Sequence, residues 1–476
     1  MNAPPRDRAG RRWWGWSAAA TLAIFAFFCY WRSHYILGDA AFYALSIAHG
    51  RFDERSIHVA YYVLGWLTHR LLRPFGVHLD EALLLLSAAA ATACVLLAWR
   101  FARALGRGAL TAFAVALILM FSGNLLDQGT SAEIYGIELA LVLASYVLYL
   151  ANRPFVSGLV FGVAMLVSPL SALAGGFFVW DLMRRRHWKP FALAVAAGVC
   201  VYVPVLAWCW RDYFFGVRGL LRVGPHRDFG PGTVVYNVFA LAKNFHWSLL
   251  FALPGMIAQW RHARSALGLT ALTLLFHLPV FVGMREDGVF MLSAYPLLAL
   301  LLADGAVAWL PPTRPPGRFL LPLIAVLYVA TASVLWLRPP SQAYRQGLLA
   351  LLGRAGREAV IIAPWHHAVA LDFYHLDYGA KGTPVAPRLW EQYVTADTLR
   401  HLLSARSDVY LVETYYPNPI VERFMSGAQR ERRWREHALL PRMQGLVAGL
   451  SADTVQDGAR APLVYRLRAP GGEIAR

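Results

Sequence analysis

An acidic residue stands among aromatic residues just after the first long apolar run of the chain. The segment GDAAFY, residues 38–43, contains Asp39, with Tyr43 one helical turn later. We expect this segment at the membrane surface, where aromatic neighbours partly desolvate a carboxylate and raise its affinity for protons. Such a carboxylate can act as a general base and take a proton from a hydroxyl or an amine. The alternative is a helix N-cap, a position that aspartate also favours.

Two further acids stand in SAEIYGIELAL, residues 131–141, where another apolar run begins. Glu133 and Tyr135 lie at its start, and Glu138 lies deeper in the run, on a different helix face from Glu133. An ionisable residue inside a membrane span is a candidate functional residue. For Glu133 the alternative is a glutamate that complements the helix dipole. For Glu138 the alternative is pairing with a polar group of a neighbouring span.

Basic residues gather in the loop YFFGVRGLLRVGPHRDFGPG at 213–232, and Arg285 of the short loop GMREDG at 283–288 could join them. Arg218 and Arg222 of the loop 213–232 are four residues apart, so a helix would direct both side chains to one side. Guanidinium groups bind phosphate through paired hydrogen bonds, which suits a lipid phosphate or pyrophosphate. The alternatives are binding of ordinary anionic headgroups and, in the second loop, pairing with adjacent acids. The predicted substrate-binding residues here are Arg218, Arg222, His226, Arg227 and Arg285.

The elements that must position these residues are membrane helices. The chain has 476 residues, of which 58% are hydrophobic and only 15% are charged, against about a quarter charged in soluble proteins. Apolar runs recur from residue 17 to residue 338 and predict a polytopic α-helical membrane protein with about 11 transmembrane helices. The predicted spans lie near 14–32, 82–100, 108–123, 133–150, 154–168, 169–183, 190–209, 247–260, 265–283, 291–310 and 319–338.

The positive charges predict which side of the membrane each loop faces. The N-terminal tail and every second short loop are rich in arginine, which indicates the cytoplasmic side. The net charge of +17 therefore does not indicate a nucleic-acid partner. We predict an inner-membrane protein with a cytoplasmic N-terminus, in which the two acidic segments and both arginine loops face outward. Two outer loops, 33–81 and 211–246, also carry arginines and break the charge rule, which a bound anion would explain; the alternative is that long loops escape the rule.

The residues after 338 change in character, because polar residues increase and apolar runs shorten. Short apolar runs at 358–363, 408–413 and 462–468 predict buried strands, and 396–406 and 420–436 have helical spacing. We therefore predict a transmembrane domain over 1–338 and a small extracytoplasmic α/β domain over 339–476. The segment 364–379 is interpreted as a strand-to-helix connection that packs the outer domain onto the membrane domain.

Taken together, these segments resemble the GT-C superfamily of membrane glycosyltransferases, and most closely bacterial relatives of the protein O-mannosyltransferases and aminoarabinose lipid A transferases. GDAAFY occupies the place of the family's acidic motif in the first outer loop. SAEIYG is similar to its Ala-Glu-x-Tyr segment, and REDGVFMLSAYPLLALLLADG at 285–305 resembles its late Arg…Tyr-Pro segment. Many spans followed by an outer domain match the family's general plan.

The resemblance implies transfer of a sugar from a polyprenyl-phosphate carrier to a lipid, glycan or protein acceptor, on the outer face and with inversion. Asp39 would be the general base and Glu133 the second acidic residue, with Tyr43 and Tyr135 beside them as substrate-binding residues. Some relatives hold a divalent cation at the second position. Many relatives have two adjacent acids, whereas Ala40 follows Asp39 here, so the need for a metal stays open and no other cofactor is implied. The alternatives are a polytopic transporter and a lipid-binding assembly protein without catalysis.

Overall fold

The structure is a computed structural model of the whole chain. It describes all residues except 1–8, 37, 51–57, 209–229, 285–288, 312, 314, 338–341, 356–358, 379–387, 406–407, 414–437, 457–462 and 469–476.

The chain divides into two compact units. Unit 1 comprises Met1–Arg32, Arg51–Leu72 and Ala82–Pro339, and unit 2 comprises Ser33–Gly50, Arg73–Glu81 and Pro340–Arg476. The last change of unit falls next to the predicted domain boundary after residue 338. Residues 33–50 and 73–81 belong to the first outer loop (residues 33–81, called the first loop below) and group with the C-terminal residues, although the sequence predicts them in the membrane domain.

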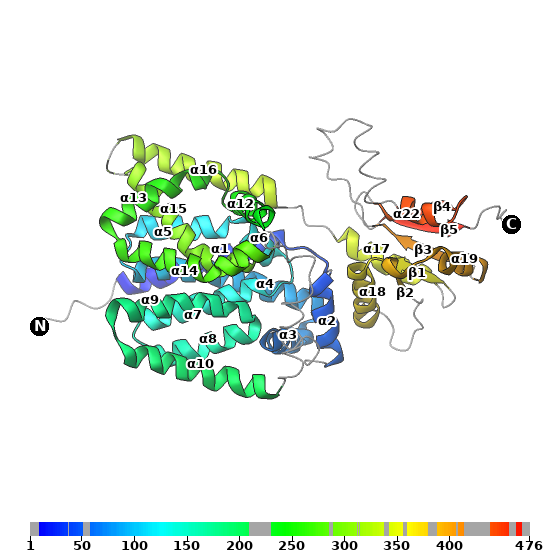
Figure 1. Cartoon of the computed structure of the whole chain (residues 1–476), viewed down its shortest axis with the longest axis horizontal. Helices are drawn as coiled ribbons and strands as arrows, with labels where there is room; N and C mark the ends of the chain where they lie inside the picture. Colours follow the sequence, from blue (N-terminus) through cyan, green and yellow to red (C-terminus); the bar gives the residue numbers. More distant parts are fainter. Residues whose placement is uncertain are drawn as a thin grey trace, which may run out of the picture. The chain divides into compact units, whose positions relative to one another are not determined.

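Unit 1 is a bundle of helices, in which η denotes a 3-10 helix (Figure 1). Its elements are α1 (Ala9–Trp31), α3 (Val59–Leu72), most of α4 (Leu79–Ala104), α5 (Ala109–Met120), α6 (Gly123–Thr130), α7 (Tyr135–Leu150), α8 (Pro154–Val167), η3 (Pro169–Gly175), α9 (Gly176–Arg185), α10 (Trp188–Trp208), α12 (Pro231–Phe245), η4 (His246–Phe251), α13 (Ala252–His262), α14 (Arg264–Gly283), η5 (Val289–Ala294), α15 (Tyr295–Trp309) and α16 (Pro315–Trp336).

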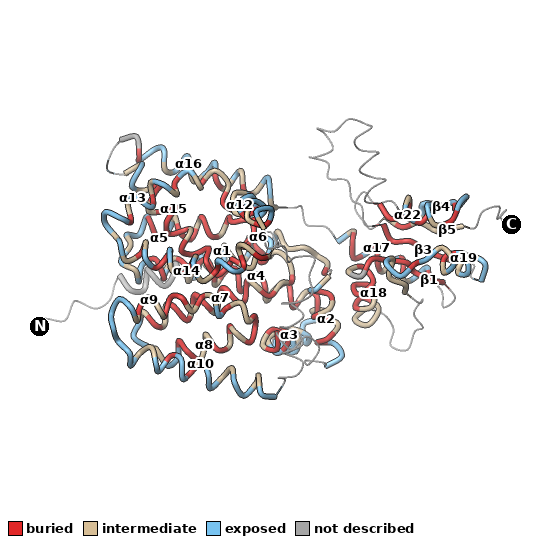
Figure 2. The backbone as a smooth tube through the Cα atoms, viewed as in Figure 1, coloured by how far each residue is buried: buried red, intermediate tan, exposed pale blue. Residues whose placement is uncertain are grey.

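Among the described residues, five helical segments are long and apolar enough to cross a membrane: α4, α10, α14, η5 with α15, and α16. The pair α5 and α6, bent by 63°, would be a sixth. Figure 2 shows that burial differs among these segments. In the most apolar 18-residue stretch of each segment, 78% of the residues are buried for η5 with α15, but only 11% for α10 and for α16. Each of the eleven predicted spans coincides with one of the helices or helix pairs of unit 1, but the number of eleven spans stays a prediction.

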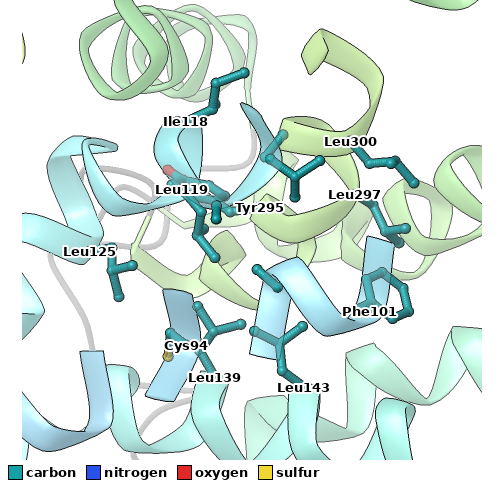
Figure 3. Packing of buried hydrophobic residues seen from close by; sticks show 14 of the residues in the cluster. Cys94, Phe101, Ile118, Leu119, Leu125, Leu139, Leu143, Tyr295, Leu297 and Leu300 are labelled. Atoms are coloured by element: carbon teal, nitrogen blue, oxygen red, sulfur yellow. The ribbon is translucent and has the colours of Figure 1, made fainter. Parts of the chain in front are cut away.

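Apolar and small side chains hold this bundle together. Cys94 of α4, Leu119 of α5, Leu139 and Leu143 of α7 and Tyr295 of α15 pack in one buried cluster (Figure 3). Small residues let backbones approach closely, as is common between membrane helices. A Cβ added at Gly158 of α8 would collide with the carbonyl oxygen of Ala194 in α10, so this helix pair requires glycine.

Unit 2 contains a five-stranded sheet in the order β2-β1-β3-β5-β4. Strands β2, β1 and β3 are parallel, and β3, β5 and β4 are antiparallel. Its elements are α2 (Gly38–His49), η2 (Arg73–Phe75), α17 (Ala343–Arg354), β1 (Val360–Ala363), α18 (Trp365–Tyr378), β2 (Arg388–Trp390), η6 (Glu391–Tyr393), α19 (Ala396–Ala405), β3 (Val409–Val412), α22 (Leu439–Leu446), β4 (Ser451–Gln456) and β5 (Val464–Arg468).

The sheet buries its central strands, as short continuous apolar runs predict. All residues of β1 and β3 are buried, and Leu399 of α19 and Met443 of α22 pack against Ile362 and Leu411. The three predicted strands are confirmed as β1, β3 and β5, and the predicted helix 396–406 as α19. The predicted helix 420–436 lies outside the described residues.

Candidate functional site

Asp39 lies in unit 2, in the first turn of α2. Gly38 begins this helix with φ +57°, a left-handed conformation that glycine adopts without strain. The side chain of Asp39 is exposed, whereas Ala40, Ala41 and Tyr43 behind it are buried. The short helix predicted from GDAAFY is therefore present, with its acidic residue at the end where backbone N–H groups favour negative charge.

Tyr43 lies on the buried side of α2. It is only 3% exposed, and its ring meets that of Phe42 edge to face, with 6.3 Å between centroids. Its predicted role in substrate binding stays a prediction.

The helix α2 packs against α18 of the same unit. Most of the segment 364–379 thus forms the helix α18 (Trp365–Tyr378), which packs against α2 and also against α17, β1 and β2. Its predicted packing onto the membrane domain stays a prediction.

Glu133 lies in unit 1, two residues before α7 begins. Its backbone is fixed by Ser87 of α4, because the Glu133 N–H donates to Ser87 Oγ at 3.3 Å and this hydroxyl lies 3.4 Å from the Glu133 carbonyl. The side chain is half-buried. Burial raises the pKa of Tyr61 in α3 well above its ordinary value, and the neighbouring charge of Glu133 raises it further. Glu133 thus stands beside a buried phenol of the first loop.

Tyr135 follows as the first residue of α7. Its N–H donates to Oε1 of Gln128 at 3.1 Å, and its ring contacts that of Phe290 edge to face, with 5.6 Å between centroids. Tyr135 and Glu133 therefore share a short, well-anchored turn before α7.

Glu138 lies inside the bundle and is 4% exposed. Its carboxyl group hydrogen-bonds to Ser168 and Ser171, where α8 ends and η3 begins. The pairing of Glu138 with polar groups of a neighbouring span is confirmed. The same break is also held by His58, whose Nδ1 lies 2.7 Å from the carbonyl oxygen of Val167.

The basic residues predicted to bind substrate, Arg218, Arg222, His226, Arg227 and Arg285, lie outside the described residues, so their roles stay predictions. Within unit 1, Lys243 at the end of α12 places its ammonium 4.7 Å from the centroid of the Trp336 ring. Its neighbour Asn244 accepts the N–H of Asn124 at 2.5 Å, and the Asn124 amide donates to the hydroxyl of Tyr295 at 3.1 Å.

Sequence reasoning did not identify this polar cluster or the Ser87 contact of Glu133. The only available signal was the presence of asparagine and serine within apolar helices, where buried polar groups require hydrogen-bond partners. That signal shows that partners exist without showing which they are.

Comparison with known proteins identifies the family. The family model "Glycosyltransferase family 87" matches residues 59–311, just over half of the chain. The matched region includes Glu133 and begins after Asp39. The search of curated proteins found no match.

Solved structures show the same fold. ArnT from Cupriavidus metallidurans bound to undecaprenyl phosphate has a TM-score of 0.60 and 15% identity, over 97% of this chain and 98% of that chain. The archaeal oligosaccharyltransferase AglB from Archaeoglobus fulgidus has a TM-score of 0.55 and 10% identity, over 83% of this chain and 69% of that chain. The arabinofuranosyltransferase AftD from Mycobacteria has a TM-score of 0.53 and 17% identity, over 100% of this chain and 42% of that chain.

These likenesses agree with the many apolar helices of unit 1. The chain is a multi-pass membrane protein that belongs to glycosyltransferase family 87, within the GT-C superfamily of membrane glycosyltransferases.

Proposed function

We propose that this glycosyltransferase moves a sugar from a polyprenyl-phosphate carrier to a lipid, glycan or protein acceptor on the outer face of the cell inner membrane. The observation that carries the proposal is the exposed carboxylate of Asp39 at the start of a helix that has one buried face. The choice of donor is supported by two proteins of similar fold, ArnT bound to undecaprenyl phosphate and AglB in complex with a dolichol-phosphate.

In the proposed reaction Asp39 takes the proton of the acceptor hydroxyl or amine. The acceptor atom forms a bond to the anomeric carbon as the bond from that carbon to the phosphate oxygen breaks, which inverts the configuration. The polyprenyl phosphate leaves with its electron pair and negative charge. Arg218 and Arg222 are proposed to stabilise this charge, because guanidinium groups bind phosphate oxygens strongly.

Glu133 is proposed as the second acidic residue of the site. Its backbone is fixed by Ser87 and its charge acts on the buried Tyr61, so it belongs to an ordered part of unit 1. A fixed carboxylate can orient the acceptor or stabilise positive charge that develops on the sugar ring.

No step of the proposed mechanism is routed through a divalent cation. Within the described ranges of the chain, no three His, Cys, Asp or Glu side chains come together as metal ligands.

The proposal also includes a topology. We propose eleven spans, a cytoplasmic N-terminus and an extracytoplasmic location for residues 339–476, from the arginine-rich loops on alternate sides. A reporter fused after Arg476 is expected outside, and one fused at Arg186 inside. Both reporters on one side would contradict this topology.

The function is tested by comparing lipid and glycan extracts of cells with and without the gene by mass spectrometry. We expect one glycoconjugate to disappear and its unglycosylated precursor to accumulate when the gene is deleted. Unchanged extracts, together with sugar uptake into vesicles that contain the chain, would instead identify a transporter.

A further inference from the structure

The backbone that leads into α2 is held by C-terminal residues of the same unit. The N–H of Ile36 donates to the hydroxyl of Tyr374 in α18 at 2.9 Å, and both residues are buried. The ring of Tyr35 lies against that of Tyr344 in α17, with 4.6 Å between centroids. Two consecutive residues of the first loop are thus fixed by two C-terminal helices, just before Asp39.

Contact with the C-terminal helices continues at the start of α2. A Cβ added at Gly38 would lie 3.7 Å from the Cβ of His366, so the first turn of α18 lies directly against the residue before Asp39. His367 hydrogen-bonds through Nδ1 to the hydroxyl of Tyr344, and the rings of His366 and His367 are 4.4 Å apart. Burial lowers the pKa of both histidines, to about 3 for His367, so both stay neutral near pH 7.

A second first-loop segment, 73–81, is bound by the same two helices. Arg345 of α17 reaches Asp80 at 3.3 Å and Glu81 at 3.1 Å. The hydroxyl of Tyr378 in α18 donates to Asp80 at 2.9 Å, and Asp377 accepts the N–H of Leu79 at 3.3 Å. Helices α17 and α18 therefore contact two parts of the first loop, residues 33–50 and residues 73–81. In the sequence these parts stand before and after residues 51–72.

We propose that α17 and α18 position the base, and that Tyr374 is the central positioning residue, because its hydroxyl fixes the backbone from which α2 begins. The inference rests on the proposed role of Asp39. A displacement of about 1 Å at a reacting group costs on the order of 10²-fold in rate. The C-terminal helices then act on catalysis through the direction in which they present the Asp39 carboxylate.

The test is Tyr374→Phe in the full chain, which keeps the ring and removes the acceptor of the Ile36 N–H. The matched control is Tyr465→Phe on β5, whose ring packs against the core of the sheet. Hydrogen exchange of peptides over residues 35–49 reports the order of α2 without any substrate. Transfer from the undecaprenyl-phosphate-linked sugar that the wild-type chain uses gives kcat, donor KM and the pH profile.

We expect Tyr374→Phe to speed exchange over residues 35–49, to lower kcat about tenfold or more with donor KM unchanged, and to shift the acid limb of the pH profile. Tyr465→Phe should do none of these. Unchanged exchange in Tyr374→Phe would overturn the proposal, and so would faster exchange with unchanged kcat. Full activity in Asp39→Asn would instead refute the role of Asp39 in the proposed function, and the positioning proposal with it. Hydrogen exchange in Tyr374→Phe does not depend on that role, so it would still report whether α18 orders α2.

Discussion

The two candidate acids stand in contrasting surroundings. Asp39 in unit 2 is exposed at the first turn of a helix whose other face is buried. Glu133 in unit 1 is half-buried, has its backbone fixed by Ser87 and lies beside the buried Tyr61. An exposed carboxylate can meet a substrate hydroxyl directly, whereas an enclosed one is better suited to orientation and electrostatics. The contrast therefore supports the proposed division of roles, with proton transfer at Asp39 and orientation or electrostatic support at Glu133.

The largest effect is expected from Asp39→Asn. Asp39 lies in the first turn of α2, where losing its charge costs about 0.3–1 kcal/mol of interaction with the helix dipole, so α2 should persist while the base is lost. A positioned general base contributes about 10²–10⁴-fold, so transfer should fall by that factor at a normal protein level. The measurement is sugar transfer in membranes with matched amounts of protein.

The control for this variant is Asp53→Asn, which changes another acid of the same loop and should have a mild effect. Near wild-type transfer in Asp39→Asn would reduce Asp39 to a helix-terminal residue and remove the contrast between the two acids.

A large effect on stability is expected in unit 2 from Arg345→Met. The change leaves Asp80 buried without its cation, and breaking a buried ion pair costs about 3–5 kcal/mol. Thermal unfolding of the purified chain should shift accordingly. The matched control is Arg400→Met, whose ion pair with Asp397 is exposed and should contribute little. Equal stability of the two variants would show that α17 does not anchor the first loop.

A smaller effect is expected at the proposed phosphate contacts. A charge-assisted hydrogen bond is worth about 1.5–3 kcal/mol, so Arg218→Ala with Arg222→Ala should raise the donor KM about tenfold or more. The KM for the acceptor should change less, because the arginines are assigned to the leaving phosphate. Donor dependence equal to that of the wild type would indicate that this loop contacts only ordinary headgroups.

The last effect is a pH dependence of stability from His367, which is absent near pH 7 and develops only in acid. Its pKa is lowered to about 3 in the folded chain by burial, against an ordinary value of 6.5. The unfolded chain therefore binds a proton below pH 6.5 that the folded chain does not. Stability should be full above that pH and fall by up to about 1.4 kcal/mol per pH unit as the pH decreases toward 3. Unfolding midpoints at pH 7.5 and pH 5 measure this, and His367→Asn should reduce the difference, whereas His401→Asn on the exposed face of α19 should not.

Local patterns in the sequence predicted the elements, but not the contacts between distant segments. Long apolar runs predicted the helices and helix pairs of unit 1 that coincide with the eleven spans, and short apolar runs predicted β1, β3 and β5, whereas α12 was not predicted. Strands β2 and β4 were missed because they are edge strands with polar residues, which carry no continuous apolar run.

The same limit applies to the candidate site. Asp39 and Glu133 could be identified from residue type and position. The bond between Ile36 and Tyr374 joins residues 338 positions apart, and no helical or strand period relates such residues. The grouping of the first-loop segments with the C-terminal residues could therefore not be predicted from periodicity.

The central claim is that the chain uses a polyprenyl-phosphate-linked sugar for transfer. The most direct measurement supplies the purified full chain with undecaprenyl-phosphate-linked pentoses and hexoses, together with a lipid extract of its own cells as acceptor. Mass spectrometry then quantifies free undecaprenyl phosphate and glycosylated acceptor. We predict that both products appear in equal amounts with at least one donor, and that neither appears with Asp39→Asn. Absence of both products with the wild-type chain, for every donor and with the protein folded, would contradict the account.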